Sequence, residues 1–201
     1  DNYPLAYYSI KACFDANIFQ NIIVASDSFK YEGVLRRYKE INKFEFIKRP
    51  KAISGDNSPT EQTIDYVLKK VAHYDETYLI QATSPLLNKM DLIKSYKKFK
   101  KYKFDSLFSA YSFNKFYWTQ NTNNNNFISH SYNYMKRPMR QKHSGGVVEN
   151  GAFYIFNTKK YLKIKNRLFG KIGCYSMPQE RSIDIDTIDD FNVATKILKK
   201  L

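Results

Sequence analysis

The sequence is poor in the residues that build cross-linked or metal-clustered proteins. Its two cysteines, Cys13 and Cys174, lie far apart in the chain, which excludes a disulfide framework and a cysteine metal cluster. We expect both to be small buried apolar residues. The three histidines have neither metal-ligand spacing nor an acidic neighbour at helical spacing, so we expect His73, His130 and His143 to be surface residues.

Long apolar runs and glycine-rich loops are also absent from the sequence. No window holds the roughly 18 consecutive apolar residues of a membrane span, and the first residues lack the basic, apolar and small-residue succession of a secretory signal. The sequence therefore predicts a cytoplasmic protein with no membrane partner. Its seven glycines form no phosphate-binding loop and no Gly-x-Ser-x-Gly elbow, so neither motif supplies an active site.

What the sequence has in excess is positive charge. With 33 Lys and Arg against 19 Asp and Glu, its formal net charge is +14. Clustered cations would bind nucleic acid, but the lysines are spread over most predicted helices, where they form solvated faces. A positive field also attracts small anions such as a nucleotide or an acidic sugar. Charge alone does not decide between these partners.

Helix and strand patterns alternate along residues 1–201, a chain with the length of a single domain. Ile64, Val67, Leu68 and Val71 follow the i, i+3, i+4, i+7 spacing of a helix. The alternation predicts an α/β fold, with a Rossmann-like, mainly parallel sheet flanked by helices on both faces. The other predicted elements are helices near 5–12, 92–99 and 188–201 and strands near 22–24, 44–47, 78–80, 105–111 and 151–156.

Polar residues directly follow several of the predicted strands. Ligands of such sheets bind beyond the carboxyl ends of the strands, so we expect Arg49, Gln81 and the loop before Asn150 to border one crevice. Ser84 is expected to cap a helix that begins at Pro85. That interpretation leaves Gln81 without an explanation.

The alternation breaks between residues 112 and 148. This stretch holds aromatic residues, an asparagine run at 123–126 that we expect to be an exposed turn between two strands, and a basic cluster. Long insertions in compact domains are often functional or form contacts between subunits. Arginine binds carboxylate or phosphate through two parallel hydrogen bonds, yet Arg137 and Arg140 taken alone favour an exposed structural role.

The hexapeptide Ser182-Ile183-Asp184-Ile185-Asp186-Thr187 is the sharpest local signal. In an extended segment the carboxylates of Asp184 and Asp186 would point the same way and suit Mg²⁺, which takes hard oxygen ligands. The alternative is that Asp186 or Thr187 caps the final helix while Asp184 lies in solvent. The hexapeptide alone leaves both interpretations open.

Several segments occur in the order of a known family. Together they resemble the bacterial acylneuraminate cytidylyltransferases, the CMP-sialic acid and CMP-nonulosonic acid synthetases. The resemblance runs from residue 3 to the end of the chain, and its two last segments are the most specific. The matching segments, in order, are Pro4-Leu5 with Tyr8-Ser9-Ile10, Ser26-Asp27-Ser28, Arg49-Pro50, residues 56–60, residues 81–85, Arg140-Gln141, residues 149–154 and residues 182–187.

The resemblance implies a nucleotide-diphospho-sugar transferase fold and a reaction in which an anomeric hydroxyl attacks the α-phosphorus of CTP and pyrophosphate leaves. The product would be a CMP-activated nonulosonic acid for surface glycans. The resemblance also implies a homodimer, with the 112–148 segment reaching the neighbouring subunit. The residues that it carries over are Asp184 and Asp186 as catalytic ligands of Mg²⁺, Arg49 and Thr60 for the nucleotide, and Gln81, Arg140, Asn150 and Tyr154 for the sugar, with Arg140 on its carboxylate.

Members of the family begin with a strand and a basic, glycine-containing loop that holds the CTP phosphates, and this chain starts just after that segment. We therefore expect a fragment that binds CTP poorly; full activity of the 201 residues would contradict this. Two alternatives stay open: a sugar nucleotidyltransferase for another nucleotide or acid sugar, and a basic nucleic-acid-binding module centred on residues 112–142. Salt-dependent oligonucleotide binding would favour the module, whereas pyrophosphate release from CTP with an acid sugar would favour the enzyme.

Overall fold

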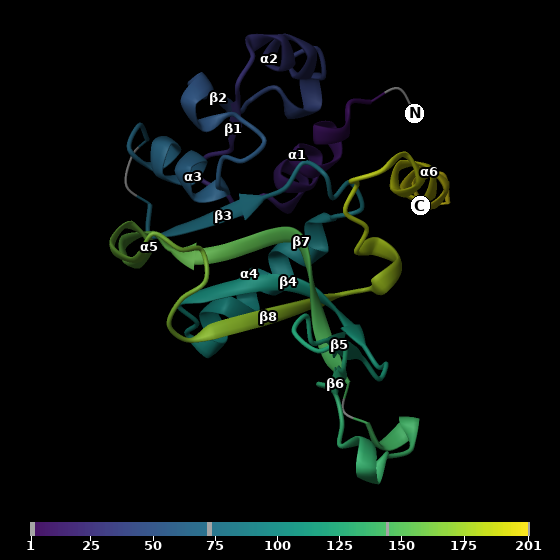
Figure 1. The fold of residues 1–201 in the computed structure, drawn as a ribbon. Coiled ribbons are helices and arrows are strands. Elements are labelled where there is room, and N and C mark those ends of the chain that lie inside the picture. Colours follow the sequence, from purple (N-terminus) through teal and green to yellow (C-terminus); the bar gives the residue numbers. More distant parts are fainter. Residues whose placement is uncertain (1–2, 72–73, 144, 201) are drawn as a thin grey trace.

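The computed structural model describes residues 3–71, 74–143 and 145–200, which form an α/β body and a projecting arm (Figure 1). The helices are α1 (Leu5–Ala16), α2 (Phe29–Leu35), α3 (Thr60–Leu68), α4 (Lys89–Tyr102), α5 (Thr158–Ile164) and α6 (Ile188–Leu198). The strands are β1 (Ile23–Ser26), β2 (Glu45–Lys48), β3 (Glu76–Ile80), β4 (Ser106–Phe113), β5 (Trp118–Gln120), β6 (Phe127–Ser129), β7 (Gly146–Asn157) and β8 (Ile172–Met177). Every helix and strand predicted from the sequence is present, with ends shifted by a few residues.

The main sheet has the strand order β3-β7-β4-β8. Strands β3, β4 and β8 share one direction, because β7 is antiparallel to both β3 and β4 and β8 is parallel to β4. The α/β class is confirmed, but the strand predicted near 151–156 runs against its neighbours. The reason is its connection: β4 and β7 form a long hairpin with the arm at its tip, and antiparallel neighbours need no crossover helix.

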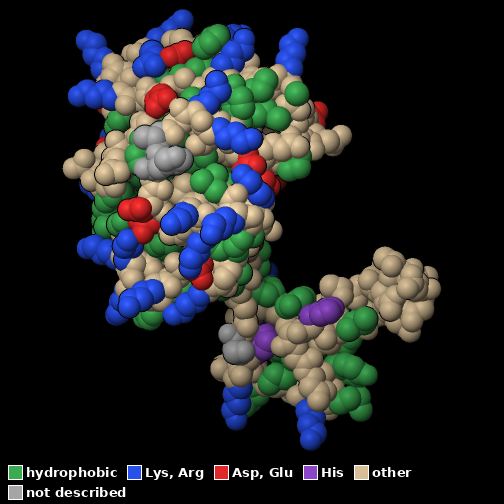
Figure 2. Space-filling model, turned by 90° about the vertical axis from the view of Figure 1, so that its left-hand side faces the viewer, with side chains coloured by type: hydrophobic (Ala, Val, Ile, Leu, Met, Phe, Trp, Pro, Cys, Tyr) green, Lys and Arg blue, Asp and Glu red, His purple; other side chains and the backbone are tan. Residues whose placement is uncertain are grey.

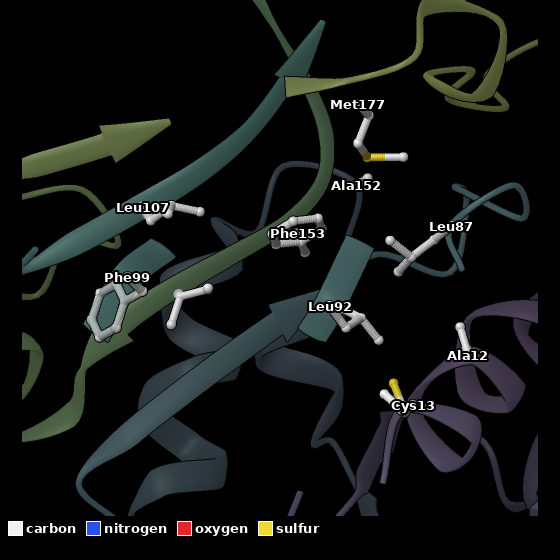
Figure 3. Packing of buried hydrophobic residues seen from close by; sticks show 11 residues of the cluster. Ala12, Cys13, Leu87, Leu92, Phe99, Leu107, Ala152, Phe153 and Met177 are labelled. Atoms are coloured by element: carbon white, nitrogen blue, oxygen red, sulfur yellow. The ribbon is translucent and has the colours of Figure 1, made fainter. Parts of the chain in front are cut away.

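The second half of β7, residues 152–156, is buried on both faces and contributes to two clusters of the core. Side chains alternate across a strand, so Phe153 and Ile155 pack into one cluster while Tyr154 and Phe156 pack into the other. Figure 3 shows Phe153 near the centre of the first cluster, which α1 and α4 cover. Helices α3 and α5 cover the second cluster with residues such as Ile64, Leu68 and Tyr161.

Helix α1 connects the main sheet with a second, smaller sheet. Strands β1 and β2 form a parallel pair, and among the described residues this pair shares no strand ladder with the main sheet. Ala12 and Cys13 of α1 pack on the main sheet, whereas Tyr7 and Ile10 pack with Phe44 beside β2. The two sheets are therefore joined through the opposite faces of one helix.

The arm comprises β5, β6 and the chain up to residue 143, and Figure 1 shows it projecting away from the sheet. An exposed turn in the asparagine run links β5 and β6, as predicted, and it closes with a 2.7 Å hydrogen bond from the Asn121 amide to the Asn126 carbonyl. His130 is exposed, but the His143 ring lies 4.8 Å from the Phe116 ring and its Nε2 atom is buried. The surface prediction is therefore wrong for His143, and His73 lies outside the described residues.

The surface of the body carries its positive charge in a scattered pattern. Figure 2 shows Lys and Arg side chains distributed over the whole of the visible face of the body, without a single continuous patch. Within the part of the chain that the structure describes, no helix is both long and apolar enough to cross a bilayer. Cys13 is buried, as expected, whereas Cys174 is only half-buried.

Candidate functional site

Asp184 lies against β7 at the end of the main sheet. It belongs to the segment that follows β8, and the next amide, that of Ile185, donates a 2.9 Å hydrogen bond to the Thr83 carbonyl. The Asp184 Oδ1 atom is buried and has no hydrogen-bond partner among the described residues. Its Oδ2 atom lies 3.3 Å from the position that a Cβ atom on Gly151 would occupy, and Gly151 has φ +70°. Only glycine fits both the backbone conformation and the close carboxylate.

Asn150 fixes the start of the same segment. Its Nδ2 atom donates a 2.9 Å hydrogen bond to Ser182 Oγ and a 3.3 Å contact to Met177 Sδ, and its Oδ1 atom accepts from the Ala152 amide. A buried amide whose hydrogen bonds are satisfied in this way is held rigidly. Asn150 is thus brought to the same place as Asp184, although its side chain is already occupied by the protein.

Tyr154 provides a protonated hydroxyl beside these residues. Its side chain donates a hydrogen bond to the Glu149 carboxylate, and the Arg167 guanidinium lies 4.9 Å from the centre of its ring. Burial first, and then the hydrogen bond and negative charge of Glu149, raise the pKa of Tyr154 well above its usual value, with a smaller contribution from Asp184. The phenol therefore remains a hydrogen-bond donor across the physiological pH range.

Gln81 follows β3 directly and also lies at this end of the sheet. The backbone amide of Gln81 donates a hydrogen bond to the Ala152 carbonyl at 3.0 Å, and the backbone carbonyl of Gln81 accepts one from Ser9 Oγ at 3.0 Å. The predicted helix cap at Ser84 is wrong. Helix α4 begins later, with Asn88 as its N-cap, because the Asn88 side chain accepts from two amides of the first turn.

Arg49 lies at the end of β2, facing α3. Its Nη1 atom donates to Thr63 Oγ1 at 3.2 Å, one turn beyond Thr60, the first residue of α3. The Arg49 Nε atom is buried without a hydrogen-bond partner among the described residues. An unpartnered guanidinium nitrogen of this kind suits an anionic ligand, because burying an unsatisfied cationic donor is costly.

The alternative to a metal-binding pair in the hexapeptide was a helix cap by Asp186 or Thr187, with Asp184 in solvent. Thr187 is the N-cap of α6 and forms a capping box with Asp190, so the capping interpretation is confirmed for Thr187. Asp184, in contrast, is not free in solvent, while the Asp186 side chain is exposed. No group of three or more His, Cys, Asp or Glu that could hold a metal is found in the described ranges.

The Asp184 and Asp186 pair fits Mg²⁺ as a donor set. One carboxylate oxygen is buried and unpartnered, and a second carboxylate lies two residues further on. Mg²⁺ is commonly bound through one or two carboxylates, with water and phosphate oxygens completing its octahedron. The side chains of Asp184 and Asp186 are therefore of the chemical kind that Mg²⁺ takes as ligands.

Arg140 is not brought to this site within one chain. It lies in the arm, in a short 3-10 helix over Arg140–Lys142, and its side chain is exposed. Its carbonyl accepts a 3.3 Å hydrogen bond from Asn114. Figure 1 shows the arm directed away from the end of the sheet where β3, β7 and the segment before α6 meet.

Two residues of the site were not predicted from the sequence. The Glu149 carboxylate accepts a hydrogen bond from the Tyr154 hydroxyl. The Arg167 guanidinium lies over the Tyr154 ring and also forms a 2.8 Å ion pair with Glu61. Glu149 directly precedes the Asn150 motif, so its position was a usable signal. Arg167 lies in a loop with no pattern around it.

Comparison with known families and proteins gives consistent matches. A family model described as cytidylyltransferase matches residues 1–200. N-acylneuraminate cytidylyltransferase B of Danio rerio is 30% identical over 193 residues, which cover 95% of this chain and 44% of that protein. Pseudaminic acid cytidylyltransferase of Campylobacter jejuni is 30% identical, with 98% of this chain and 86% of that protein covered. The chain thus spans less than half the length of the first relative.

The fold is shared with solved nucleotidyltransferase structures. The 4-diphosphocytidyl-2C-methyl-D-erythritol synthase of Anaerococcus prevotii superimposes with a TM-score of 0.70 at 11% identity, covering 97% of this chain and 89% of that one. At this identity the likeness concerns the fold alone, which is of the nucleotide-diphospho-sugar transferase type.

Proposed function

The chain belongs to the cytidylyltransferase family, and from this premise we propose that it activates a nonulosonic, sialic-acid-like sugar with CTP, giving a CMP-sugar and pyrophosphate. The observation that carries the proposal is the buried, unpartnered Oδ1 atom of Asp184 beside Gly151 and Tyr154. The named relatives act on N-acylneuraminate and pseudaminic acid, which supports the same class of sugar. The proposed destination is a surface glycan, and the proposed location is the cytoplasm.

The proposed reaction requires the protein mainly to position the sugar hydroxyl against the α-phosphorus of CTP. The anomeric hydroxyl oxygen of the sugar forms a bond to the α-phosphorus, and its proton is released to solvent. The bond from that phosphorus to the bridging oxygen breaks, and the electron pair leaves with pyrophosphate. Catalysis of such a transfer rests on alignment and charge neutralisation. Asp184 and Asp186 would hold Mg²⁺, which when bound neutralises charge on the phosphate oxygens.

The remaining site residues would bind the two substrates. Arg49 presents a buried guanidinium nitrogen without a partner, and with Thr60 at the start of α3 it would contact the nucleotide. Gln81, Asn150 and Tyr154 would line the sugar side. Of these, Tyr154 donates its one hydroxyl proton to Glu149, so its oxygen would accept from a hydroxyl of the sugar, whereas Asn150 acts by holding the segment before Asp184.

Purified protein expressed from the complete gene is expected to release pyrophosphate when CTP and a nonulosonic acid are both present. A panel of neuraminic, legionaminic and pseudaminic acids, assayed with and without Mg²⁺, identifies the substrate. ATP, GTP and UTP serve as matched controls for the nucleotide. Pyrophosphate release with another nucleotide but not with CTP would contradict the proposal. So would a lack of release with every acid sugar of the panel.

The arm suggests that the active unit is a homodimer in which Arg140 serves the partner's site. The arm exposes large apolar side chains, among them Trp118, Phe127 and Met135, which a second copy would cover. Arg140 has an exposed side chain at the end of this arm. It would then reach the sugar carboxylate bound to the other subunit.

Mixing two inactive variants tests the shared site. We expect Arg140→Met and Asp184→Asn to be inactive alone, and their mixed dimers to regain about one quarter of wild-type activity. Half of randomly reassembled dimers are mixed, and each has one intact site. The control is a mixture of Asp184→Asn with Tyr154→Phe. These two residues belong to the same subunit's site, so no mixed dimer of these variants has an intact site. The control mixture should stay inactive, and an Arg140→Met mixture that fails to recover in the same way would place Arg140 in its own subunit's site.

A further inference from the structure

A buried ion pair links α4 to the segment that carries Asp184. The two terminal nitrogens of Arg181 face the two carboxylate oxygens of Asp91, with Nη2 3.0 Å from Oδ1 and Nη1 bonded to Oδ2. The Asp91 side chain is 2% exposed and that of Arg181 is 15% exposed. This two-point geometry fixes the guanidinium in one orientation.

The ion pair is embedded in further hydrogen bonds. Arg181 Nη1 also donates to the Leu86 carbonyl at 3.2 Å, on the loop between β3 and α4. Asp91 accepts from the Asn88 amide at 3.2 Å, as part of the α4 capping box, and from the Tyr175 hydroxyl at 3.4 Å. Asp91 is therefore a fixed carboxylate, and Arg181 has one well-defined place to bind.

Arg181 lies three residues before Asp184. The segment between them is attached at three points: Arg181 to Asp91, Ser182 to Asn150 at 2.9 Å, and the Ile185 amide to the Thr83 carbonyl at 2.9 Å. Of these three attachments, only the first is a charged pair between buried side chains. Met177, the last residue of β8, belongs to the core, whereas none of the apolar side chains of residues 178–187 is fully buried, and Ile183 and Ile185 are half-buried.

We propose that Arg181 is a positioning residue, whose ion pair with Asp91 holds the backbone of residues 182–185 so that the Asp184 carboxylate lies in the site. The consequence for turnover rests on the proposed function, whereas the positioning itself does not. Because the two apolar side chains of this segment, Ile183 and Ile185, are only half-buried, we expect the polar attachments to contribute much of what fixes its conformation. Misplacing a catalytic group by about 1 Å can cost about 10²-fold in rate.

Hydrogen exchange measures the positioning without any substrate. In Arg181→Met we expect the amide of Ile185 and the peptide over 182–187 to exchange about tenfold faster or more, while β7 stays protected. Arg37→Met removes an exposed arginine from another part of the body and is the control. Unchanged exchange in 182–187, or equal acceleration throughout β7, would overturn the proposal.

Two further variants guard against simple unfolding. Arg181→Met leaves Asp91 buried and unpaired, so the double variant Asp91→Asn with Arg181→Met removes both charges. The double variant is expected to recover thermal stability and still show fast exchange in 182–187. Arg181→Lys keeps the charge but loses the two-point geometry, and the same segment should loosen in it. A protected segment in the double variant would show that the pair does not hold it.

Kinetics then connect the position to the reaction. In protein from the complete gene, Arg181→Lys should lower kcat by about 10²-fold and leave KM for CTP close to its wild-type value. Unchanged kcat with a loosened segment would overturn the link to Asp184. If the wild-type protein transfers no cytidylyl group, the proposed function fails, while hydrogen exchange still decides the positioning.

Discussion

Replacing Asp184 with asparagine is expected to lower the rate of pyrophosphate release by about 10²- to 10³-fold. The substitution keeps the shape of the side chain and removes the negative charge that would hold Mg²⁺ against the phosphates. The Asp184 Oδ1 atom has no hydrogen-bond partner in residues 3–71, 74–143 and 145–200, so the fold should be about as stable as the wild type. Steady-state assays and thermal melting of the two proteins measure both effects.

Two neighbouring aspartates make the test specific. Asp189→Asn changes an exposed residue in the first turn of α6 and should leave turnover unchanged. Asp186→Asn should lower turnover as well, because the exposed carboxylate would complete the donor set. Wild-type rates in Asp186→Asn would remove that residue from the metal role, and wild-type rates in Asp184→Asn would remove the central support for the proposed function.

Truncating Phe153 to alanine is expected to destabilise the fold by about 3–5 kcal/mol. The side chain is 0% exposed at the centre of β7, and its ring centre lies 6.0 Å from both the Tyr78 and the Tyr175 rings. A cavity at this position removes contacts with β3 and β8 together. A total stability of about 5–15 kcal/mol is usual for a domain, so the loss is a large part of the whole.

Urea denaturation followed by circular dichroism gives the free energy of unfolding. Val147→Ala is the matched control, since Val147 lies on the same strand but is 48% exposed, and it should change stability by no more than about 0.5 kcal/mol. Equal effects from the two variants would mean that β7 is not the centre of the core.

Local spacing was enough to predict most of the regular elements of the body. The four apolar positions from Ile64 to Val71 identified α3, and the run at 78–80 identified β3, because each pattern reflects burial of a single face or of a whole strand. The asparagine run was correctly predicted as an exposed turn, since short polar side chains favour turns.

The elements that were missed have weak local patterns. Strand β8 contains Gly173, Cys174 and Ser176 among its apolar residues, so neither alternation nor a continuous apolar run is visible. Helix α5 has only seven residues. The direction of β7 was also beyond local patterns, because it depends on pairing with β3 and β4 and on the arm that returns the chain.

For the site, too, local segments of the sequence identified residues, whereas the long-range contacts between them could not be predicted. Gln81, Asn150, Tyr154 and Asp184 were predicted from their segments, and the structure brings these segments to one end of the sheet. The contacts that hold them were not predictable. Arg181 and Asp91 are 90 residues apart, and only the packing of α4 against the main sheet makes them neighbours.

The bridging position of α1 has a consequence for substrate capture. Arg49 is carried by the β1–β2 sheet, and Asp184 and Tyr154 are carried by the main sheet, while no strand ladder crosses between the two sheets in the described ranges. A hinge motion at α1 would therefore rupture no interstrand hydrogen bonds. Such a motion would cost side-chain repacking and the hydrogen bonds from Arg49 to Thr63 and from Ser9 to the Gln81 carbonyl, and it would change the separation of Arg49 and Asp184 while both sheets stay intact.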